Sequence, residues 1–276
     1  MFDTTSLLDK GTLVMGVINV TPDSFSGDGI YRDVGAVADR AAEFIEQGAA
    51  ILDVGGESTR PGFRPVAPEE ELARVIPAVR ALVRITSVPV SVDTRQPDVA
   101  ERALAEGVKL INDVSGLADP RMTDLAAREG CGLVCMYNGG LPLDADTGPF
   151  LLQAVKDVVK RAQSFGVRPE SIIVDPGLGF GKKWRENFAV MRHLQSLSVM
   201  RLPILVGPSR KRMISRALGD NQRVREGSLA LAAICAANGA TIIRAHDVRD
   251  TVKTVHMIDA LRQPERFPQQ TTLQAQ

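Results

Sequence analysis

One pattern recurs eight times along the chain: a short apolar segment rich in β-branched residues, then a segment with apolar residues three to four positions apart. The first kind of segment is typical of a buried strand, and the second of an amphipathic helix. The predicted strands cover residues 13–20, 49–54, 88–92, 108–111, 132–136, 171–174, 202–206 and 241–243. The predicted helices cover residues 34–47, 68–84, 97–106, 120–128, 149–165, 186–197, 212–218, 227–238 and 251–261. Strands that alternate with helices in this way require a parallel sheet.

Eight such units in about 250 residues have the size of a (β/α)8 barrel, so the sequence predicts an α/β protein with the TIM-barrel fold. We expect one domain over residues 1–276, with a core at about 13–262 and a flexible tail at 263–276. An open, doubly wound sheet is the alternative, but neither of its glycine-rich nucleotide-binding motifs is present. Pro77 should bend the helix at 68–84 or end its first part.

Composition excludes several classes of protein. The chain carries 33 basic and 33 acidic residues, whereas a nucleic-acid binder would normally show a basic excess. No stretch approaches the roughly 18 apolar residues of a membrane span, and residues 1–10 lack the apolar core of a secretory signal. Cys131, Cys135 and Cys235 are too few for a disulfide framework, so we expect buried free thiols in a cytoplasmic protein that binds neither nucleic acid nor membranes.

Polar residues stand where the predicted strands end. The second strand, for example, breaks at two glycines that permit a sharp turn and is followed by Glu57-Ser-Thr-Arg60. The strand-end residues are Asn19, Asp53, Asp93, Asn112, Tyr137, Asp175, Ser209, Lys211, Arg244 and His246. A helix cap or a turn explains any one of them. Because the carboxyl ends of barrel strands meet at one rim, the set as a whole predicts an active site there.

The residue types at this rim indicate the ligand. Two carboxylates can accept hydrogen bonds from the amino-pyrimidinone edge of a flat heterocycle, while an Asn amide and a Lys serve its acceptor atoms. Arg244 and His246, together with Asn19 across the mouth, suit a phosphate-type anion. His193 and His256 fall inside predicted helices and receive no role. Lys182, Lys183 and Trp184 are predicted to lie in a solvated loop.

At this point the chain resembles dihydropteroate synthase over roughly residues 13–260. The resemblance is carried by Asn19-Val-Thr-Pro-Asp-Ser-Phe-Ser26, residues 53–62, Ser91-Val-Asp-Thr94, Ile111-Asn-Asp113, Asp175-Pro-Gly-Leu-Gly-Phe-Gly-Lys182, Gly207-Pro-Ser-Arg-Lys211 and Arg244-Ala-His-Asp247. All of these segments occur in the family's order. The resemblance implies an enzyme that joins 6-hydroxymethyl-7,8-dihydropterin diphosphate to 4-aminobenzoate, giving 7,8-dihydropteroate and pyrophosphate, with Mg²⁺ on the leaving group.

The resemblance also implies roles for individual residues. Asp93, Asn112, Asp175 and Lys211 would hold the pterin. Asn19 would bind the metal, and Arg244 with His246 the diphosphate; Lys211, Asp93, Arg244 and His246 form the implied catalytic set. Thr59 and Ser209 would lie near the diphosphate or the aminobenzoate, and Phe25, Arg60 and Pro61 would belong to loops that close over the aminobenzoate. The partners are then these small-molecule substrates, and the family suggests a homodimer through the last helices.

The chain departs from the family pattern in three places. The fifth loop reads Met136-Tyr-Asn-Gly-Gly-Leu-Pro142 where Met-His is usual, the first loop reads Ser26-Gly-Asp-Gly29, and Glu186 replaces a common histidine. Two other functions stay open at this stage. One is a pterin-dependent methyltransferase barrel, which would not need the Thr59-Arg60 loop or Lys211. The other is a paralogue that binds pterins, or a partner protein, without turnover.

Overall fold

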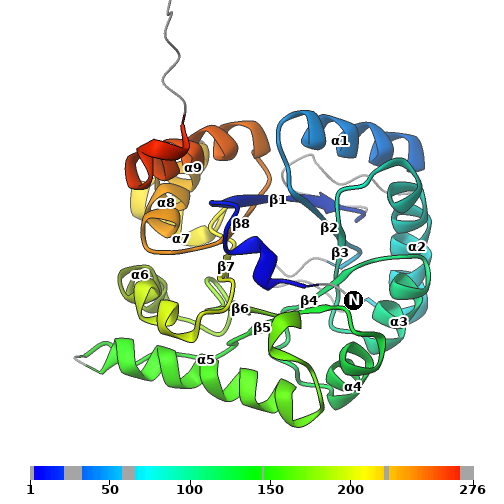
Figure 1. Cartoon of the computed structure of the whole chain (residues 1–276), viewed down its shortest axis with the longest axis horizontal. Helices are drawn as coiled ribbons and strands as arrows, with labels where there is room; N and C mark the ends of the chain where they lie inside the picture. Colours follow the sequence, from blue (N-terminus) through cyan, green and yellow to red (C-terminus); the bar gives the residue numbers. More distant parts are fainter. Residues whose placement is uncertain (1–2, 22–32, 58–65, 145, 221–223, 268–276) are drawn as a thin grey trace, which may run out of the picture.

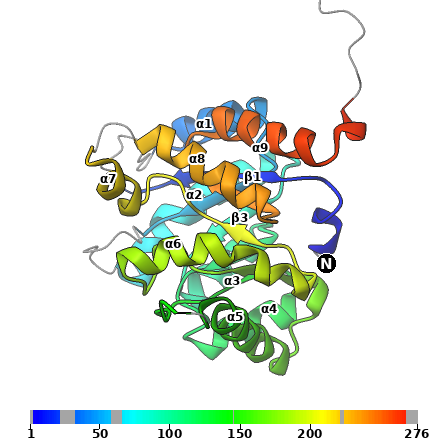
Figure 2. The same cartoon turned by 90° about the vertical axis from the view of Figure 1, so that its left-hand side faces the viewer.

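The computed structural model describes residues 3–21, 33–57, 66–144, 146–220 and 224–267. Eight parallel strands form a barrel, and helices pack around it (Figures 1 and 2). The strands are β1 (Leu13–Asn19), β2 (Ile51–Gly55), β3 (Val90–Asp93), β4 (Leu110–Asp113), β5 (Gly132–Met136), β6 (Ile172–Asp175), β7 (Leu205–Val206) and β8 (Ile242–Ala245). The helices are α1 (Val34–Glu46), α2 (Pro68–Ile85), α3 (Pro97–Ala105), α4 (Pro120–Glu129), α5 (Thr147–Ser164), α6 (Trp184–His193), α7 (Arg212–Leu218), α8 (Val224–Ala237) and α9 (Val248–Arg262). The predicted (β/α)8 barrel is confirmed.

The strand order closes the sheet on itself. Neighbouring strands run β6-β5-β4-β3-β2-β1-β8-β7 and pair in parallel. Val17 lies opposite Asp53, and Asp93 lies opposite Asn112. A parallel bridge between Val174 and Ile204 joins β6 to the segment before β7. All strands therefore point the same way, and their carboxyl ends lie at one end of the barrel.

Two apolar cores follow from the alternation of side chains along each strand. Outward-facing residues pack against the helices in the larger core. Inward-facing residues fill the barrel in a second cluster: Met15, Ile51, Leu110, Val134, Ile173, Leu205 and Ile242, joined by Leu7. Leu7 belongs to a short 3₁₀ turn, Thr5–Leu7, at the end of the barrel opposite α7 (Figure 2). Below the strand ends the barrel is thus filled mainly by apolar side chains, and buried charged groups stand at its carboxyl-end mouth.

Local sequence explains where the helices begin. Helices α2, α3 and α4 each open on a proline, which lacks the N–H that would be unsatisfied at that position. Asp33 and Asp119 precede α1 and α4, and their carboxylates accept hydrogen bonds from Ala36 N and Arg121 N. Helix α4 ends at Gly130, whose φ of 60° is the left-handed conformation favoured at a helix terminus.

The structure decides between the two outcomes expected at Pro77 and corrects two sets of predicted boundaries. Pro77 does not end its helix, because α2 runs unbroken from Pro68 to Ile85 and buries Val75, Val79 and Leu82 on either side of it. The helix predicted at 186–197 begins earlier, at Trp184, and gives way at Leu194 to a 3₁₀ segment, Leu194–Met200. Strands β3, β4 and β6 continue past the last apolar residue, and β8 continues through Arg244 to Ala245, because backbone pairing does not depend on side-chain polarity.

The described part of the chain also bears on two expectations from composition. No helix in the described ranges is long and apolar enough to cross a membrane. Cys131, Cys135 and Cys235 are free and buried, as predicted. Burial raises the pKa of the Cys131 thiol to about 12, so this cysteine is a packing residue and not a nucleophile.

Candidate active site

The polar side chains of the mouth stand one layer above the apolar filling of the barrel. Four of them lie two positions after a residue of the inner cluster, and so face inward on the same strand: Asp53 after Ile51, Asn112 after Leu110, Asp175 after Ile173, and Arg244 after Ile242. Asp113, one position later than Asn112, faces the other way, and its carboxylate accepts a hydrogen bond from Ser115 N at 2.7 Å. Because side chains alternate along β4, Asn112 faces the site, whereas Asp113 stabilises the turn that follows the strand.

Arg244, on β8, binds carboxylates from β2 and β3 at the centre of the mouth. Its Nε lies 2.6 Å from Asp53 Oδ2, and its Nη2 lies 2.6 Å from Asp93 Oδ2. Asn112 Nδ2 donates to the same Asp53 oxygen at 3.1 Å. Asp53, Asp93 and Asn112 are buried, and the Arg244 side chain is 19% exposed. Buried charges are tolerated only when paired, so this network accounts for two carboxylates at the barrel centre.

The network leaves acceptor atoms unused. Asp53 Oδ1 and Asp93 Oδ1 are buried and have no hydrogen-bond partner among the described residues. Burial raises the pKa of Asp93, and the nearby Asp53 adds to this, whereas the Arg244 guanidinium opposes it. Burial alone would lower the pKa of Arg244, but the carboxylates of Asp53 and Asp93 outweigh it, so Arg244 stays cationic. The free oxygens can accept N–H donors from a ligand.

Asp175 and Lys211 form the neighbouring part of the mouth. Asp175 Oδ1 accepts a hydrogen bond from Gly177 N at 2.7 Å. Burial raises the pKa of Asp175 to about 6, against the opposing effect of Gly177 N–H and Lys211. Burial lowers the pKa of Lys211 to about 8, and the positive charge of Arg244 lowers it further, while Asp175 and Asp93 raise it. Lys211 and the two carboxylates are therefore close enough to influence one another.

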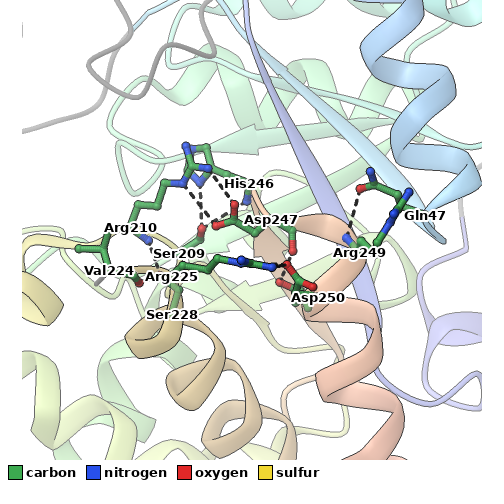
Figure 3. Close-up of polar contacts among 11 residues, drawn as sticks. Gln47, Ser209, Arg210, Val224, Arg225, Ser228, His246, Asp247, Arg249 and Asp250 are labelled. Carbon is green, nitrogen blue, oxygen red and sulfur yellow. Dashed lines mark hydrogen bonds and ion pairs between the residues drawn. The ribbon is translucent and has the colours of Figure 1, made fainter. Parts of the chain in front are cut away.

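A second group of contacts holds the ends of β7 and β8 together, as Figure 3 shows. Ser209 Oγ lies 3.0 Å from His246 Nδ1. Arg210, which has a left-handed φ of 54°, donates from Nη2 to Asp247 Oδ1 at 2.8 Å and from its backbone N to Ser228 Oγ. The unusual backbone of Arg210 lets the residues on either side of it, Ser209 and Lys211, meet different partners.

Asn19 is the last residue of β1 and lies beside Gly55 in the register of the sheet. Met15 faces inward, so Asn19, four residues on, faces the mouth from the same side of the strand. Its amide oxygen is a hard donor of the kind Mg²⁺ takes, and one protein ligand with phosphate oxygens is a common arrangement. The described residues contain no cluster of three or more His, Cys, Asp or Glu able to hold a metal. Among the described residues, Asn19 would therefore need oxygen atoms from a ligand to complete the coordination of a Mg²⁺ ion.

The structure brings most of the predicted site residues to one mouth and leaves four undecided. Asp93, Asn112 and Arg244 share one network, Lys211 stands beside Asp175, and Ser209 contacts His246. Phe25, Thr59, Arg60 and Pro61 lie outside the described residues.

One residue of the site, Asp53, is not predicted from sequence as a binding residue. It stands among the predicted strand ends, yet its carboxylate accepts hydrogen bonds from both Arg244 and Asn112. Its spacing of two from Ile51 was the available signal. The solvated loop predicted at Lys182 and Trp184 is wrong. Lys182 Nζ donates to two backbone carbonyls, and Trp184 opens α6 and packs against the outer core.

Two cavities found among the described residues lie away from this mouth. One, of about 750 Å³, is an open groove between α2 and α3 with Leu72 and Ile76 in its lining. The other, of about 270 Å³, lies beside Thr12 and Asp259. Asp259 already accepts from the backbone and hydroxyl of Thr12. Neither cavity gathers the buried charged groups of the strand ends, so the candidate active site is the barrel mouth.

Fold and site together define a barrel enzyme whose mouth can hold a small polar heterocycle beside an anion. The model of the family described as pterin binding enzyme matches residues 15–246. This range runs from inside β1 to the histidine just after β8, and it contains the whole network of Asp53, Asp93, Asn112 and Arg244.

Curated relatives and solved structures narrow the assignment. The dihydropteroate synthase of Bacillus subtilis (strain 168) is 41% identical over 252 residues, covering 91% of this chain and 88% of that protein. The enzyme of Escherichia coli (strain K12) is 40% identical over 256 residues, covering 90% of each. A Clostridium difficile dihydropteroate synthase, solved in the presence of pteroic acid, has a TM-score of 0.86 at 39% identity and covers 95% of this chain and 99% of that one. The chain belongs to the dihydropteroate synthase family of pterin-binding enzymes.

Proposed function

We propose that this protein is a dihydropteroate synthase, which condenses 6-hydroxymethyl-7,8-dihydropterin diphosphate with 4-aminobenzoate. The observation that carries the proposal is the joint network of Arg244, Asp53, Asp93 and Asn112 with Asp175 and Lys211 beside it. Relatives support the same substrates: a Xanthomonas albilineans dihydropteroate synthase was solved with 4-aminobenzoic acid, at 38% identity and a TM-score of 0.85. The dihydropteroate synthase of Yersinia pestis was solved in complex with a sulfonamide drug.

The carboxylates and the amide of the mouth suit the pterin. Its N–H groups are donors that match the unpaired oxygens of Asp53 and Asp93 and the carboxylate of Asp175. Lys211 is a cationic donor for the acceptor atoms of the ring system. A buried site rejects a ligand that leaves such groups unpaired, so this arrangement favours a pterin over a plain aromatic ring.

The reaction breaks the C–O bond between the pterin methylene and the diphosphate, and the electron pair leaves with pyrophosphate. The amine of 4-aminobenzoate then forms a C–N bond to the methylene carbon and gives up one proton to solvent. Negative charge from Asp53, Asp93 and Asp175 stabilises the cation that develops on the pterin, since these groups already lie in place. A weakly basic aniline needs no strong general base once the carbon carries positive charge.

The anion-binding side of the mouth is proposed to hold the leaving group. Arg244, Ser209 and His246 supply donors there, although two donors of Arg244 are engaged by Asp53 and Asp93. Mg²⁺, which Asn19 would hold together with the diphosphate, would neutralise charge on the departing oxygens. Thr59, Arg60, Pro61 and Phe25 are proposed, on the resemblance alone, to contact the aminobenzoate.

Release of pyrophosphate tests the function directly. We expect purified protein to release pyrophosphate only when pterin diphosphate and 4-aminobenzoate are both present, and to slow markedly when EDTA removes Mg²⁺. An arylamine sulfonamide should compete with 4-aminobenzoate and not with the pterin. Pterin binding without pyrophosphate release, measured on the same preparation by calorimetry, would instead identify a non-catalytic paralogue.

The pH dependence of kcat/KM for the pterin substrate should be bell-shaped. Asp175 accepts pterin N–H groups most strongly, and with both oxygens, when it is ionised, and its pKa is raised to about 6, so activity should fall below that pH. Lys211 is cationic only below its lowered pKa of about 8, so activity should fall above it. Such limbs report groups of the free enzyme. A rate that stays flat from about pH 5 to about pH 9 would contradict the roles given to both residues.

We also propose that the protein forms a homodimer through α8 and α9, which lie side by side (Figures 1 and 2). Ile234, Met257 and Leu261 on these helices are 44%, 69% and 80% exposed. Apolar residues on the outer face of a helix commonly mark a contact with another subunit. Light scattering on wild type and on Met257→Glu should give a dimer and a monomer, respectively. The three buried free thiols support a cytoplasmic location.

A further inference from the structure

The turn at residues 176–181 packs directly against the fifth loop. A Cβ at Gly177 would overlap the carbonyl oxygen of Tyr137, so no other residue fits there without moving one of the two backbones. A Cβ at Gly181 would lie 2.8 Å from Asn138 Oδ1. Both glycines have positive φ, 71° and 60°. The two loops are therefore in backbone contact beside Asp175, at the pterin end of the site.

The Lys182 side chain forms hydrogen bonds to both of these loops. Its Nζ donates to Tyr137 O at 3.0 Å and to Phe180 O at 3.1 Å. The same ammonium lies 4.8 Å from the centroid of the Tyr137 ring. The charged groups near it are Asp175 and Glu186, which favour its cationic form, and Lys211, which opposes it. Burial lowers the pKa of Lys182 to about 8, so it remains charged at neutral pH.

The turn at residues 176–181 also contacts Lys211. Lys211 Nζ lies 4.3 Å from the centroid of the Phe180 ring. A Cβ at Gly179 would lie 3.0 Å from Lys211 Cδ, so the lysine stem runs along this glycine. The path of Lys211 toward Asp175 is thus bounded by the two residues 179 and 180, just before Lys182. Any shift of this turn moves the surface against which Lys211 rests.

Glu186 provides a second anchor for the fifth loop. Its Oε2 accepts hydrogen bonds from Leu141 N at 3.2 Å and from Lys183 N at 3.1 Å. Two residues of one segment, Lys182 and Glu186, therefore hold two points of the loop that departs from the family pattern. The hydrogen bonds of Glu186 go to Leu141 and to the start of α6. Those of Lys182 include the turn that borders Lys211.

We propose that Lys182 is a positioning residue: by holding the carbonyls of Tyr137 and Phe180 it fixes the turn against which Lys211 binds the pterin. The proposal rests on the proposed function in taking the ligand to be a pterin, but it does not require turnover. It predicts that the loss of Lys182 weakens pterin binding through Phe180 and Lys211, without a change in any residue that touches the ligand.

Calorimetric titration with pteroic acid at neutral pH tests this inference. We expect Lys182→Met, which keeps the apolar stem but removes the donors, to weaken binding about tenfold, since two charge-assisted hydrogen bonds are lost. Lys183→Met, which removes the same charge from an exposed neighbour, should stay within about twofold of wild type. Lys182→Arg, which keeps a cationic donor, should recover most of the affinity.

A double-mutant cycle separates positioning from general loosening. Phe180→Leu should weaken pteroic acid binding by itself, and adding Lys182→Met should cost less than it does in wild type. Three results would overturn the proposal. The losses of affinity in Phe180→Leu and Lys182→Met could be additive in the double variant. Lys182→Met could lose no more affinity than Lys183→Met, or it could bind pteroic acid as tightly as wild type. If Lys182→Met does not fold, wild-type affinity in Phe180→Leu overturns it instead. Failure of the proposed function is seen separately, as wild-type protein that binds pteroic acid but releases no pyrophosphate.

Discussion

Replacing Arg244 by methionine is expected to lower the free energy of unfolding by about 3–5 kcal/mol and to abolish turnover. Arg244 is the only cation within hydrogen-bonding distance of Asp53 and Asp93 among the interactions of the described residues, and both carboxylates are buried. Without it, two like charges would share the centre of the barrel. Burial already raises the pKa of Asp93, and loss of Arg244 would raise it further, so one carboxylate should take up a proton. Urea unfolding followed by circular dichroism measures the loss.

Two further variants make the Arg244 result specific. Arg225, which pairs with Asp250 on the surface and is 60% exposed, is the matched control, and Arg225→Met should cost less than about 1 kcal/mol. Adding Asp53→Asn to Arg244→Met should restore part of the stability, because one unpaired carboxylate is removed, but it should not restore activity. If Arg244→Met is as stable as Arg225→Met, the central ion pair contributes little to the fold and the geometry described for it is wrong.

Lys211→Met should reduce kcat/KM for the pterin substrate by about 10²–10³-fold while leaving the barrel folded. Lys211 is half-buried beside Asp175 and Arg244, and its pKa is lowered to about 8 by burial and by Arg244. Methionine has a similar stem and removes a charge that these surroundings disfavour, so the thermal midpoint should stay unchanged or rise. The residual activity should also lose the alkaline limb of the pH profile that Lys211 contributes. Steady-state kinetics with both substrates give this comparison.

The neighbouring Arg212 provides the control for Lys211. Arg212 opens α7 and is exposed, so Arg212→Met removes one positive charge at the adjacent position without entering the mouth. It should leave kcat/KM for the pterin within about threefold of wild type. Equal losses in the two variants would mean that overall charge, and not the position of Lys211, controls the rate.

Much of the barrel and its mouth could be predicted because both follow from periodicity. Apolar runs locate the strands, and parallel strands bring their carboxyl ends together whatever their distance in sequence. Asp93, Asn112, Asp175 and Arg244 could be selected on that ground alone. The specific role of Asp53 could not, because its partners Arg244 and Asn112 are distant in the chain and nothing local to residue 53 indicates them.

The errors have physical causes of a different kind. Lys182 follows glycines and stands beside a second lysine, which is a typical solvated pattern, yet it is held by the carbonyl of Tyr137, 45 residues away. Glu186 and the fifth loop are two departures from the family pattern that lie far apart in the sequence. In the structure they are in contact, because Glu186 accepts a hydrogen bond from Leu141 N. Pro77 is compatible with a continuous α2 because the flanking residues bury enough apolar surface to maintain it.

A crystal structure with pteroic acid tests the central claim most directly, namely that residues from separate strands form one pterin site at the barrel mouth. We predict that the pterin ring lies within hydrogen-bonding distance of Asp175 and Asn112, with Lys211 beside it. Pteroic acid bound in the groove between α2 and α3, with the mouth residues unchanged and without ligand at saturating concentration, would contradict the claim.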